Sequence, residues 1–373
     1  MGLRIYAFAQ VGNTGLQTGS PFEDQMKGCW QAKANAREGY VEILTCDIEL
    51  TAMSHGIAKS LPANGIWRNS EIGSTMDATC KQASVTLSDG ATLQVKLLGA
   101  DDQTKPLLIA LHGAQGVSDH REPLRSFGFL STRFRLLVYD ARGSGRSDDK
   151  EPFTHQRWAA DVNELREWAG ANKAVIAGGS YGGMVALEYA LAYPRCVSAL
   201  ILRDTWANGV LGVLRCLKSV LTDGRIRPDA DRQVRAWSGN IRDNEDLAAA
   251  FIEILPIYTP EDKAGQNTSS TLDKDMRAEA DELILHYKAH NFCFTHNQPR
   301  FDLRDRLEQI NVPTLVVCGR HDPITPVMFS EEIAQCVPNA QLIVFENSGH
   351  SPPSDEPDAF RDRVWQFVDQ IAV

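Results

Sequence analysis

A serine between two glycines carries the strongest chemical signal in this chain. Ser180 follows a short apolar run that begins at Lys173, and it precedes a helical pattern. The spacing Gly178-x-Ser180-x-Gly182 in that setting is that of a nucleophile elbow, a turn that strains the serine backbone and requires small neighbours. The hydroxyl is then exposed at the positive end of the following helix. Ser180 is therefore predicted to be a nucleophile.

A serine hydroxyl needs a base, and the base needs an orienting acid. His350 follows the last predicted strand, and Asp322 follows the strand before it. The chain order serine, aspartate, histidine is the one expected for an elbow on an α/β sheet. We expect His350 to remove the proton of Ser180 and Asp322 to hold the histidine tautomer. Asp204, at the end of another predicted strand, is the alternative acid.

The oxyanion formed on attack needs two N–H donors aimed at it. The backbone N–H of Tyr181, directly after the serine, is the expected first donor. We expect the second donor to be the N–H of Ala114, in the loop His112–Gly116. His112 itself is interpreted as a residue that braces this loop.

Alternating strands and helices must position these residues. The predicted strands cover residues 85–87, 91–98, 106–112, 135–140, 173–179, 197–202, 313–319 and 341–345. The predicted helices of the same region cover residues 122–132, 155–169, 326–336 and 357–371, with one more directly after Ser180. An Asp-Gly turn joins the first two strands into a hairpin. The pattern predicts an α/β fold with a mostly parallel sheet and helices on both faces.

The alternation of strands and helices stops near Asp204 and resumes at Pro313. We interpret residues 83–204 and 305–373 as the core, and residues 205–304 as a helical lid inserted at the end where the serine lies. An acidic stretch inside this insertion, residues 259–275, is predicted to be a loop.

Residues 1–82 are interpreted as an N-terminal extension of unknown role. A helix near residues 22–37 and a strand within residues 40–50 are the elements expected there. The opening of the chain has too short an apolar run for a secretory signal.

Composition narrows the class of protein. A formal charge of −10 with no basic cluster argues against nucleic-acid or anionic-membrane partners. No segment approaches the ~18 apolar residues that span a bilayer. The eight cysteines show neither CxxC nor metal-ligand spacing, so we expect reduced thiols, no metal, no cofactor and a cytoplasmic location.

Several motifs resemble one known family. Residues 140–147 match an Asp-x-Arg-Gly-x-Gly-x-Ser loop, the elbow resembles Gly-Gly-Ser-Trp-Gly, and Leu202 is followed by Arg203 before the lid. With these motifs, the chain from residue 83 onward resembles the α/β-hydrolase family, in its proline iminopeptidase-like branch. The resemblance implies Ser180, Asp322 and His350 as the triad, and hydrolysis without metal or cofactor.

Two departures from that branch bear on the substrate. The oxyanion loop reads His-Gly-Ala-Gln-Gly at residues 112–116, where the branch has His-Gly-Gly-Pro-Gly. The branch binds the free amine of a peptide with lid glutamates, but here Trp237 is followed by Ser-Gly-Asn, and the later stretch offers Lys288. A desolvated ammonium needs a carboxylate partner. The lid acids that could substitute are Glu245, Asp246 and Glu253.

The leading hypothesis is a serine hydrolase that acts through an acyl-enzyme on an ester, lactone or amide bond of a small-molecule or short-peptide substrate. Release of N-terminal residues by an aminopeptidase is the first alternative. A transferase or lyase, or a ligand receptor on the same fold, is the second. The lid aromatics expected to line a substrate pocket are Trp206, Trp237, Tyr258, Tyr287 and Phe292. The sequence does not specify an oligomeric state.

Overall fold

The computed structural model describes residues 32–35, 40–43, 79–260 and 283–371. The chain divides into two units, Met1–Leu61 and Pro62–Val373. In the first unit, β1 (Ala32–Asn35) pairs antiparallel with β2 (Tyr40–Ile43). The expected strand is thus present over its described residues. The expected helix is wrong for residues 32–35, because pairing with β2 holds them extended; its remainder lies outside the described residues.

An eight-stranded sheet forms the centre of the second unit. Its strands are β3 (Cys80–Thr86), β4 (Thr92–Leu98), β5 (Leu107–Leu111), β6 (Arg135–Tyr139), β7 (Ala174–Gly179), β8 (Val197–Arg203), β9 (Thr314–Gly319) and β10 (Ala340–Phe345). The order across the sheet is β10-β9-β8-β7-β5-β6-β4-β3, and only the β3–β4 and β4–β6 pairs are antiparallel. The predicted α/β fold with a mostly parallel sheet is therefore confirmed.

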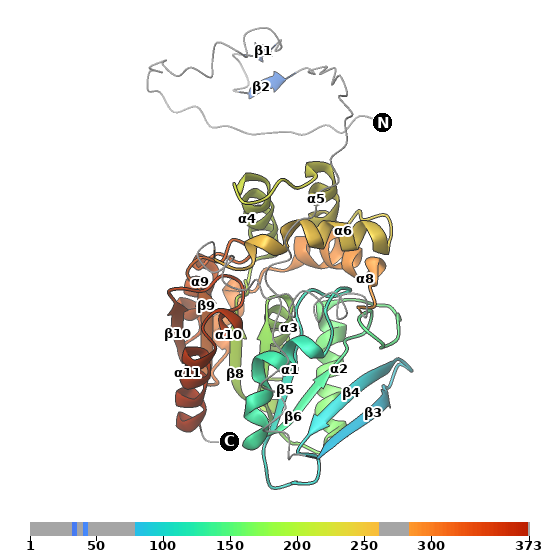
Figure 1. Cartoon of the computed structure of the whole chain (residues 1–373), viewed down its shortest axis with the longest axis vertical. Coiled ribbons are helices and arrows are strands. Elements are labelled where there is room, and N and C mark those ends of the chain that lie inside the picture. Colours follow the sequence, from blue (N-terminus) through green and yellow to red (C-terminus); the bar gives the residue numbers. More distant parts are fainter. Residues whose placement is uncertain (1–31, 36–39, 44–78, 261–282, 372–373) are drawn as a thin grey trace, which may run out of the picture. The chain divides into compact units, whose positions relative to one another are not determined.

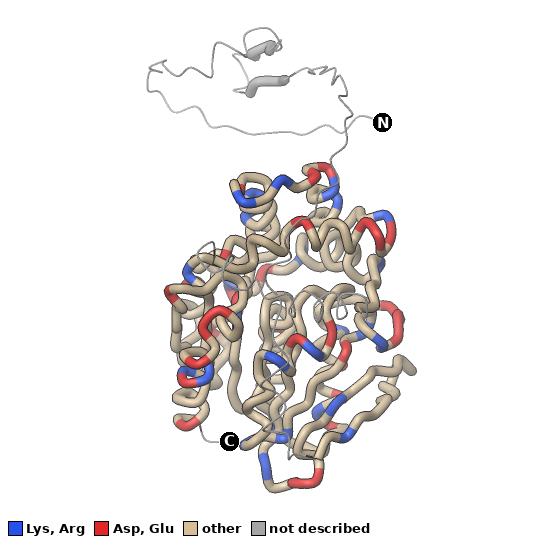
Figure 2. The backbone as a smooth tube through the Cα atoms, viewed as in Figure 1, with Lys and Arg blue, Asp and Glu red and all other residues tan. Residues whose placement is uncertain are grey.

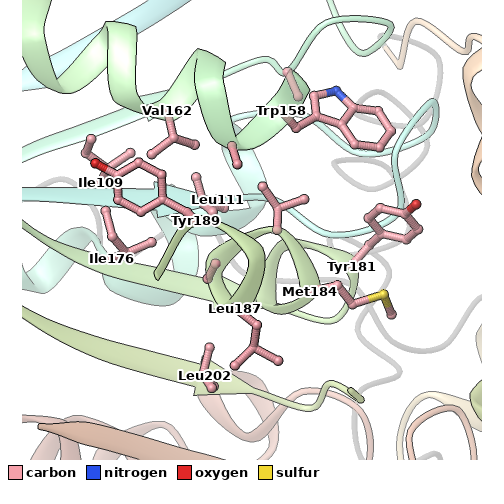
Figure 3. Close-up of a cluster of buried hydrophobic side chains, with 14 of the residues drawn as sticks. Ile109, Leu111, Trp158, Val162, Ile176, Tyr181, Met184, Leu187, Tyr189 and Leu202 are labelled. Carbon is pink, nitrogen blue, oxygen red and sulfur yellow. The ribbon is translucent and has the colours of Figure 1, made fainter. Parts of the chain in front are cut away.

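Helices cover both faces of this sheet (Figure 1). They are α1 (Arg121–Phe127), α2 (His155–Trp168), α3 (Tyr181–Ala192), α9 (Met328–Cys336), α10 (Pro352–Asp355) and α11 (Pro357–Gln370). Successive side chains along a strand point to opposite faces of the sheet, so each strand contributes to two apolar clusters, one on each face. Leu107 and Ile109 join the cluster under α2 and α3, shown in Figure 3, whereas Leu108 and Ala110 join the cluster under α1 and α11.

The chain between β8 and β9 forms the helical segment that we call the lid. Its described helices are α4 (Gly209–Thr222), α5 (Ala230–Trp237), α6 (Asn244–Ile254) and α8 (Tyr287–Phe292), with a π-helical turn at Cys293–Asn297 and short 3-10 turns at Leu255–Ile257, Gln298–Arg300 and Arg304–Gln309. In Figure 1 the four helices gather at one end of the sheet. Most of the loop expected over residues 259–275 lies outside the described residues.

Charged residues of both signs are interspersed along the described chain in the view of Figure 2. Among the described helices, none has both the length and the apolar character needed to cross a bilayer.

Candidate active site

Ser180 occupies a strained turn between β7 and α3. Its backbone φ of 52° and ψ of −122° lie outside the regions that ordinary residues prefer. The flanking glycines are required by close backbone contacts. A Cβ on Gly178 would lie 2.4 Å from the carbonyl oxygen of Gly182, and a Cβ on Gly182 would lie 2.6 Å from the carbonyl oxygen of Leu111. The turn is held from β8 by a 2.8 Å bond from the Ser180 N–H to the carbonyl of Arg203.

His350 and Asp322 form a buried hydrogen-bonded pair. The imidazole Nδ1 of His350 lies 2.8 Å from Oδ2 of Asp322. The Thr325 hydroxyl donates to that same oxygen, and the other carboxylate oxygen accepts the N–H groups of Ile324 (2.7 Å) and Thr325 (3.0 Å). Four donors thus fix both carboxylate oxygens, so the orientation of the imidazole is determined by the loop after β9.

Burial and the partner charge have opposite effects on the pKa values of this pair. Burial alone would lower the pKa of His350, but the adjacent carboxylate of Asp322 outweighs it, and the net shift is upward. For Asp322, burial raises the pKa, but His350 and the hydroxyl of Thr325 outweigh it, and the net shift is downward. Asp322 is therefore charged at neutral pH and stabilises the protonated form of His350.

The loop that carries His350 is fixed from two sides. The N–H of His350 donates to the carbonyl of Tyr258 at 2.8 Å, and its carbonyl accepts Nη1 of Arg203 at 3.0 Å. The Tyr258 ring meets the imidazole edge-on, with centroids 5.0 Å apart. Because Tyr258 belongs to the lid, the lid contacts the histidine loop directly.

Asp204, the alternative acid, has other partners. Its Oδ1 accepts the N–H of Gly319 at 3.0 Å, and its second oxygen faces Arg203 at 3.4 Å. Burial, and then the negative charge of Asp322, raise the pKa of Asp204 to about 8. The geometry therefore pairs Asp322, rather than Asp204, with His350.

The loop His112–Gly116 lies against the serine. A Cβ on Gly113 would be 3.1 Å from the Cβ of Ser180, and Ala114 has a φ of 40°, rare for a residue with a side chain. Nε2 of His112 accepts the N–H of Ala141 at 3.1 Å, and Nδ1 contacts the carbonyl of Gly113 at 2.8 Å. His112 therefore connects this loop to the start of the loop after β6.

A cavity opens beside Ser180 under the lid. It is lined by Ala114, Gln115, Ser180, Tyr181, Met184, Trp206, Gln233, Ala236, Trp237, Ala250, Phe251, Ile254, Tyr258, His290, Cys293, Phe294 and Ile324. Three of the five expected aromatics, Trp206, Trp237 and Tyr258, are in this wall. Tyr287 and Phe292 are not. Tyr287 packs on the small apolar cluster around Val117 and Leu247, and Phe292 packs edge-on against Phe153 at 6.0 Å.

Several lining residues were not identified from the sequence. Met184 lies one helical turn after Ser180 on α3, a spacing that could have revealed it. Gln233 and Phe251 come from α5 and α6, and no local signal in the sequence distinguishes them from packing residues.

Carboxylates are missing from the cavity wall among the described residues. Glu253 instead pairs with Arg232 and accepts Nε2 of Gln233 at 2.9 Å. Asp246 pairs with Arg235 at 2.9 Å, and Glu245 is exposed. Lys288 is exposed as well. Of the lid acids considered above, none faces the cavity.

The loop after β6 holds an arginine in a structural role. The guanidinium of Arg142 is fully buried and binds both oxygens of Asp161, at 2.6 and 2.8 Å. It also donates to the carbonyl of Lys150 at 3.2 Å.

Comparisons with known proteins identify the family of this fold. Residues 106–357 match the family described as alpha/beta hydrolase fold. The chain is 30% identical over 289 residues to the proline iminopeptidase PfmaB of Pestalotiopsis fici, covering 76% of this chain and 98% of that protein. It is 25% identical over 283 residues to a putative carbamate hydrolase, RutD, of Cronobacter turicensis, covering 73% and 94%.

A solved structure gives the same result. The crystal structure of a hydrolase from Pseudomonas aeruginosa PA01 superposes with a TM-score of 0.60 at 26% identity, covering 77% of this chain and 98% of that one. The strand order, the elbow and these matches lead to one conclusion: the chain belongs to the α/β-hydrolase family and, within it, to the proline iminopeptidase-like branch.

Proposed function

We propose that this hydrolase uses Ser180, His350 and Asp322 as a catalytic triad to cleave an ester, lactone or amide bond of a small neutral substrate through an acyl-enzyme. The 2.8 Å bond between Nδ1 of His350 and Asp322 is the observation that carries the proposal. A proton on Nδ1 leaves the Nε2 lone pair free, which is the form of imidazole that can act as a base.

In the first half-reaction, Ser180 Oγ attacks the carbonyl carbon while His350 takes the hydroxyl proton. The N–H groups of Tyr181 and Ala114 stabilise the negative oxygen of the tetrahedral intermediate. His350 then gives its proton to the leaving group, and the acyl group stays on the serine. In the second half-reaction, a water molecule attacks the acyl carbon while His350 takes its proton. His350 then returns a proton to Ser180 Oγ, and the acid is released.

The cavity supports a neutral substrate. Its wall is mainly apolar and aromatic, and its described residues include no carboxylate. A desolvated ammonium would therefore lack a counter-charge, which costs several kcal/mol. An uncharged ester, lactone, carbamate or amide carries no such penalty.

Aminopeptidase activity is the second candidate, and one observation favours it. The relative PfmaB, at 30% identity, is named a proline iminopeptidase. For that activity, the substrate amine would have to bind a carboxylate, and Glu253 is a lid acid bonded to a lining residue, Gln233.

Two fluorogenic substrates separate these candidates: a short-chain aryl ester and a prolyl arylamide, each assayed with wild type and Ser180→Ala. We expect ester turnover by wild type, none by Ser180→Ala, and no arylamide cleavage. Serine-dependent arylamide cleavage would establish the aminopeptidase instead. Turnover that persists in a folded Ser180→Ala protein, or failure of a fluorophosphonate to label Ser180, would contradict the proposed nucleophile.

A further inference from the structure

One lid residue bridges two loops of the core. The backbone N–H of His286, just before α8, donates to the carbonyl of Gly116 at 2.8 Å. The imidazole Nε2 of the same residue lies 2.9 Å from the carbonyl of Gly145 and donates to it. The first carbonyl belongs to the loop that carries Ala114, and the second to the loop after β6.

The approach of α8 to these loops depends on glycine. Gly116 has a φ of +80°, and a Cβ there would lie 2.6 Å from the carbonyl oxygen of His286 and 2.9 Å from the N–H of His290. Gly143 has a φ of +69°, and a Cβ there would lie 2.7 Å from the Cβ of Ala289. Backbone packs directly on backbone here, so a small displacement of α8 would move Gly116 with it.

Gly116 is two residues from Ala114, the expected oxyanion donor. The φ of 40° at Ala114 is a strained conformation, which costs about 1–3 kcal/mol and persists only where neighbouring contacts enforce it. From the core side, the Ser144 hydroxyl accepts the N–H of Gly116 at 2.9 Å. Within the loop, the carbonyl of Ala114 accepts the N–H groups of Val117 and Ser118, both at 2.9 Å. From the lid side, the N–H of His286 donates to the carbonyl of Gly116.

We propose that His286 is a positioning residue for the oxyanion hole: by binding Gly116 and Gly145 together, it fixes the direction of the Ala114 N–H. This inference rests on the proposed function, since it assigns His286 a role in stabilising the tetrahedral intermediate. The residue acts through the loop and does not touch the substrate. Loss of the imidazole leaves the backbone bond to Gly116 but releases His286 from Gly145, so that the lid no longer fixes the loop. Binding of the transition state is therefore weakened, and binding of the intact substrate is unchanged.

The test compares three variants in the full chain: His286→Ala, the rescue variant His286→Gln, and the control His296→Ala. Gln can present an amide N–H near the position of the imidazole Nε2. His296 is a lid histidine whose ring contacts that of Phe292 in a tilted arrangement, with centroids 4.6 Å apart. Steady-state kinetics on the aryl ester gives kcat and KM for each variant.

We expect kcat of His286→Ala to fall about 10- to 100-fold, part of the ~10²–10³ that loss of a whole oxyanion donor costs, while KM stays within about twofold. His286→Gln should recover most of kcat, and His296→Ala should match wild type. An unchanged kcat in His286→Ala, or a rise in KM alone, would overturn the proposal.

A covalent inhibitor gives an independent measurement. Addition of Ser180 Oγ to a trifluoromethyl ketone passes the serine proton to His350 and leaves the ketone oxygen as an anion in the oxyanion hole. Its inhibition constant should rise in parallel with the loss of kcat. Affinity of the double variant Ser180→Ala/His286→Ala for the intact ester should equal that of Ser180→Ala. A parallel loss of both affinities would contradict a positioning role.

A replacement variant and the Ser180→Ala control separate failure of this inference from failure of the proposed function. If His286→Ala does not fold, His286→Leu, which fills a similar space but cannot donate to the carbonyl of Gly145, replaces it, with the same kinetic outcome expected. An active Ser180→Ala protein would refute the proposed function. By contrast, an active wild type that loses activity in Ser180→Ala, with His286→Ala fully active, would refute this inference alone.

Discussion

Replacing Asp322 by asparagine tests the assignment of the acid. The variant keeps an oxygen for the N–H groups of Ile324 and Thr325, so the loop after β9 should stay folded. At the other position, an NH₂ group replaces Oδ2 and faces Nδ1 of His350 across 2.8 Å. Because NH₂ donates, Nδ1 must accept, and the imidazole proton moves to Nε2. That nitrogen is the one needed to take the proton of Ser180.

The size of the effect follows from the tautomer and the lost charge. An aspartate-to-asparagine change in this role lowers kcat by about 10⁴, which corresponds to roughly 5.4 kcal/mol of transition-state stabilisation. Asp204→Asn is the matched control. Asparagine tolerates the φ of 46° at this position and can still accept the N–H of Gly319. Because burial and then Asp322 raise the pKa of Asp204 to about 8, the native side chain is already mostly neutral at pH 7.

Steady-state hydrolysis of the aryl ester at pH 7 measures both variants, with urea unfolding to confirm that each is folded. We expect Asp322→Asn to lose about 10⁴ in kcat and Asp204→Asn to lose less than about tenfold. The reverse ranking would transfer the orienting role to Asp204. A loss below about tenfold in both variants would refute the triad mechanism itself.

Two further predictions concern pH and packing. Because the net shift raises the pKa of His350 above 6.5 and the base must be neutral, kcat/KM should fall on acidification with a midpoint above pH 6.5. In Asp322→Asn, burial acts on His350 without the carboxylate partner, so the residual activity should have a lower midpoint. An unshifted midpoint would assign the acidic loss of activity to another group. In Gly182→Ala, the new Cβ would lie 2.6 and 2.7 Å from the carbonyl oxygens of Leu111 and His112, so the free energy of unfolding in urea should fall by about 1–3 kcal/mol or more. The control Gly224→Ala has open space and no positive φ, and its free energy of unfolding should change by less than about 0.5 kcal/mol. Equal stability of the two variants would contradict the packing argument.

The fold and the positions of the three proposed triad residues could be predicted because their signals are local. Ser180, Asp322 and His350 each follow an apolar strand after a few residues at most, and parallel strands present their carboxyl ends at one edge of the sheet. The pattern of strands therefore brings together residues that are up to 170 positions apart in the chain. The Asp322–His350 bond lies where this reasoning places it.

The cavity wall could not be predicted in the same way, because it depends on how the lid helices pack. Phe292 and Cys293 are adjacent in the chain, and neighbours on a helix point about 100° apart. Cys293 lines the cavity together with His290 and Phe294, at spacings of three and four residues, and this directs Phe292 toward Phe153. The sequence shows the helical period but not which of its faces meets the core.

The arrangement of the lid also supports the proposed neutral substrate over a charged amine. Gln233 is fully buried in the wall, and its amide donates to Glu253 while its oxygen accepts Nε1 of Trp237 at 3.2 Å. The carboxylate of Glu253 is thus held behind the wall, and its charge is balanced by Arg232. An ammonium that recruited Glu253 would break its charge-assisted hydrogen bonds to Arg232 and Gln233, worth about 1.5–3 kcal/mol each. Arg232 would keep only its contacts with Asp246 at 3.3 Å and Asp229 at 3.8 Å. A neutral acyl group requires none of this rearrangement, and the present arrangement of the lid therefore favours it.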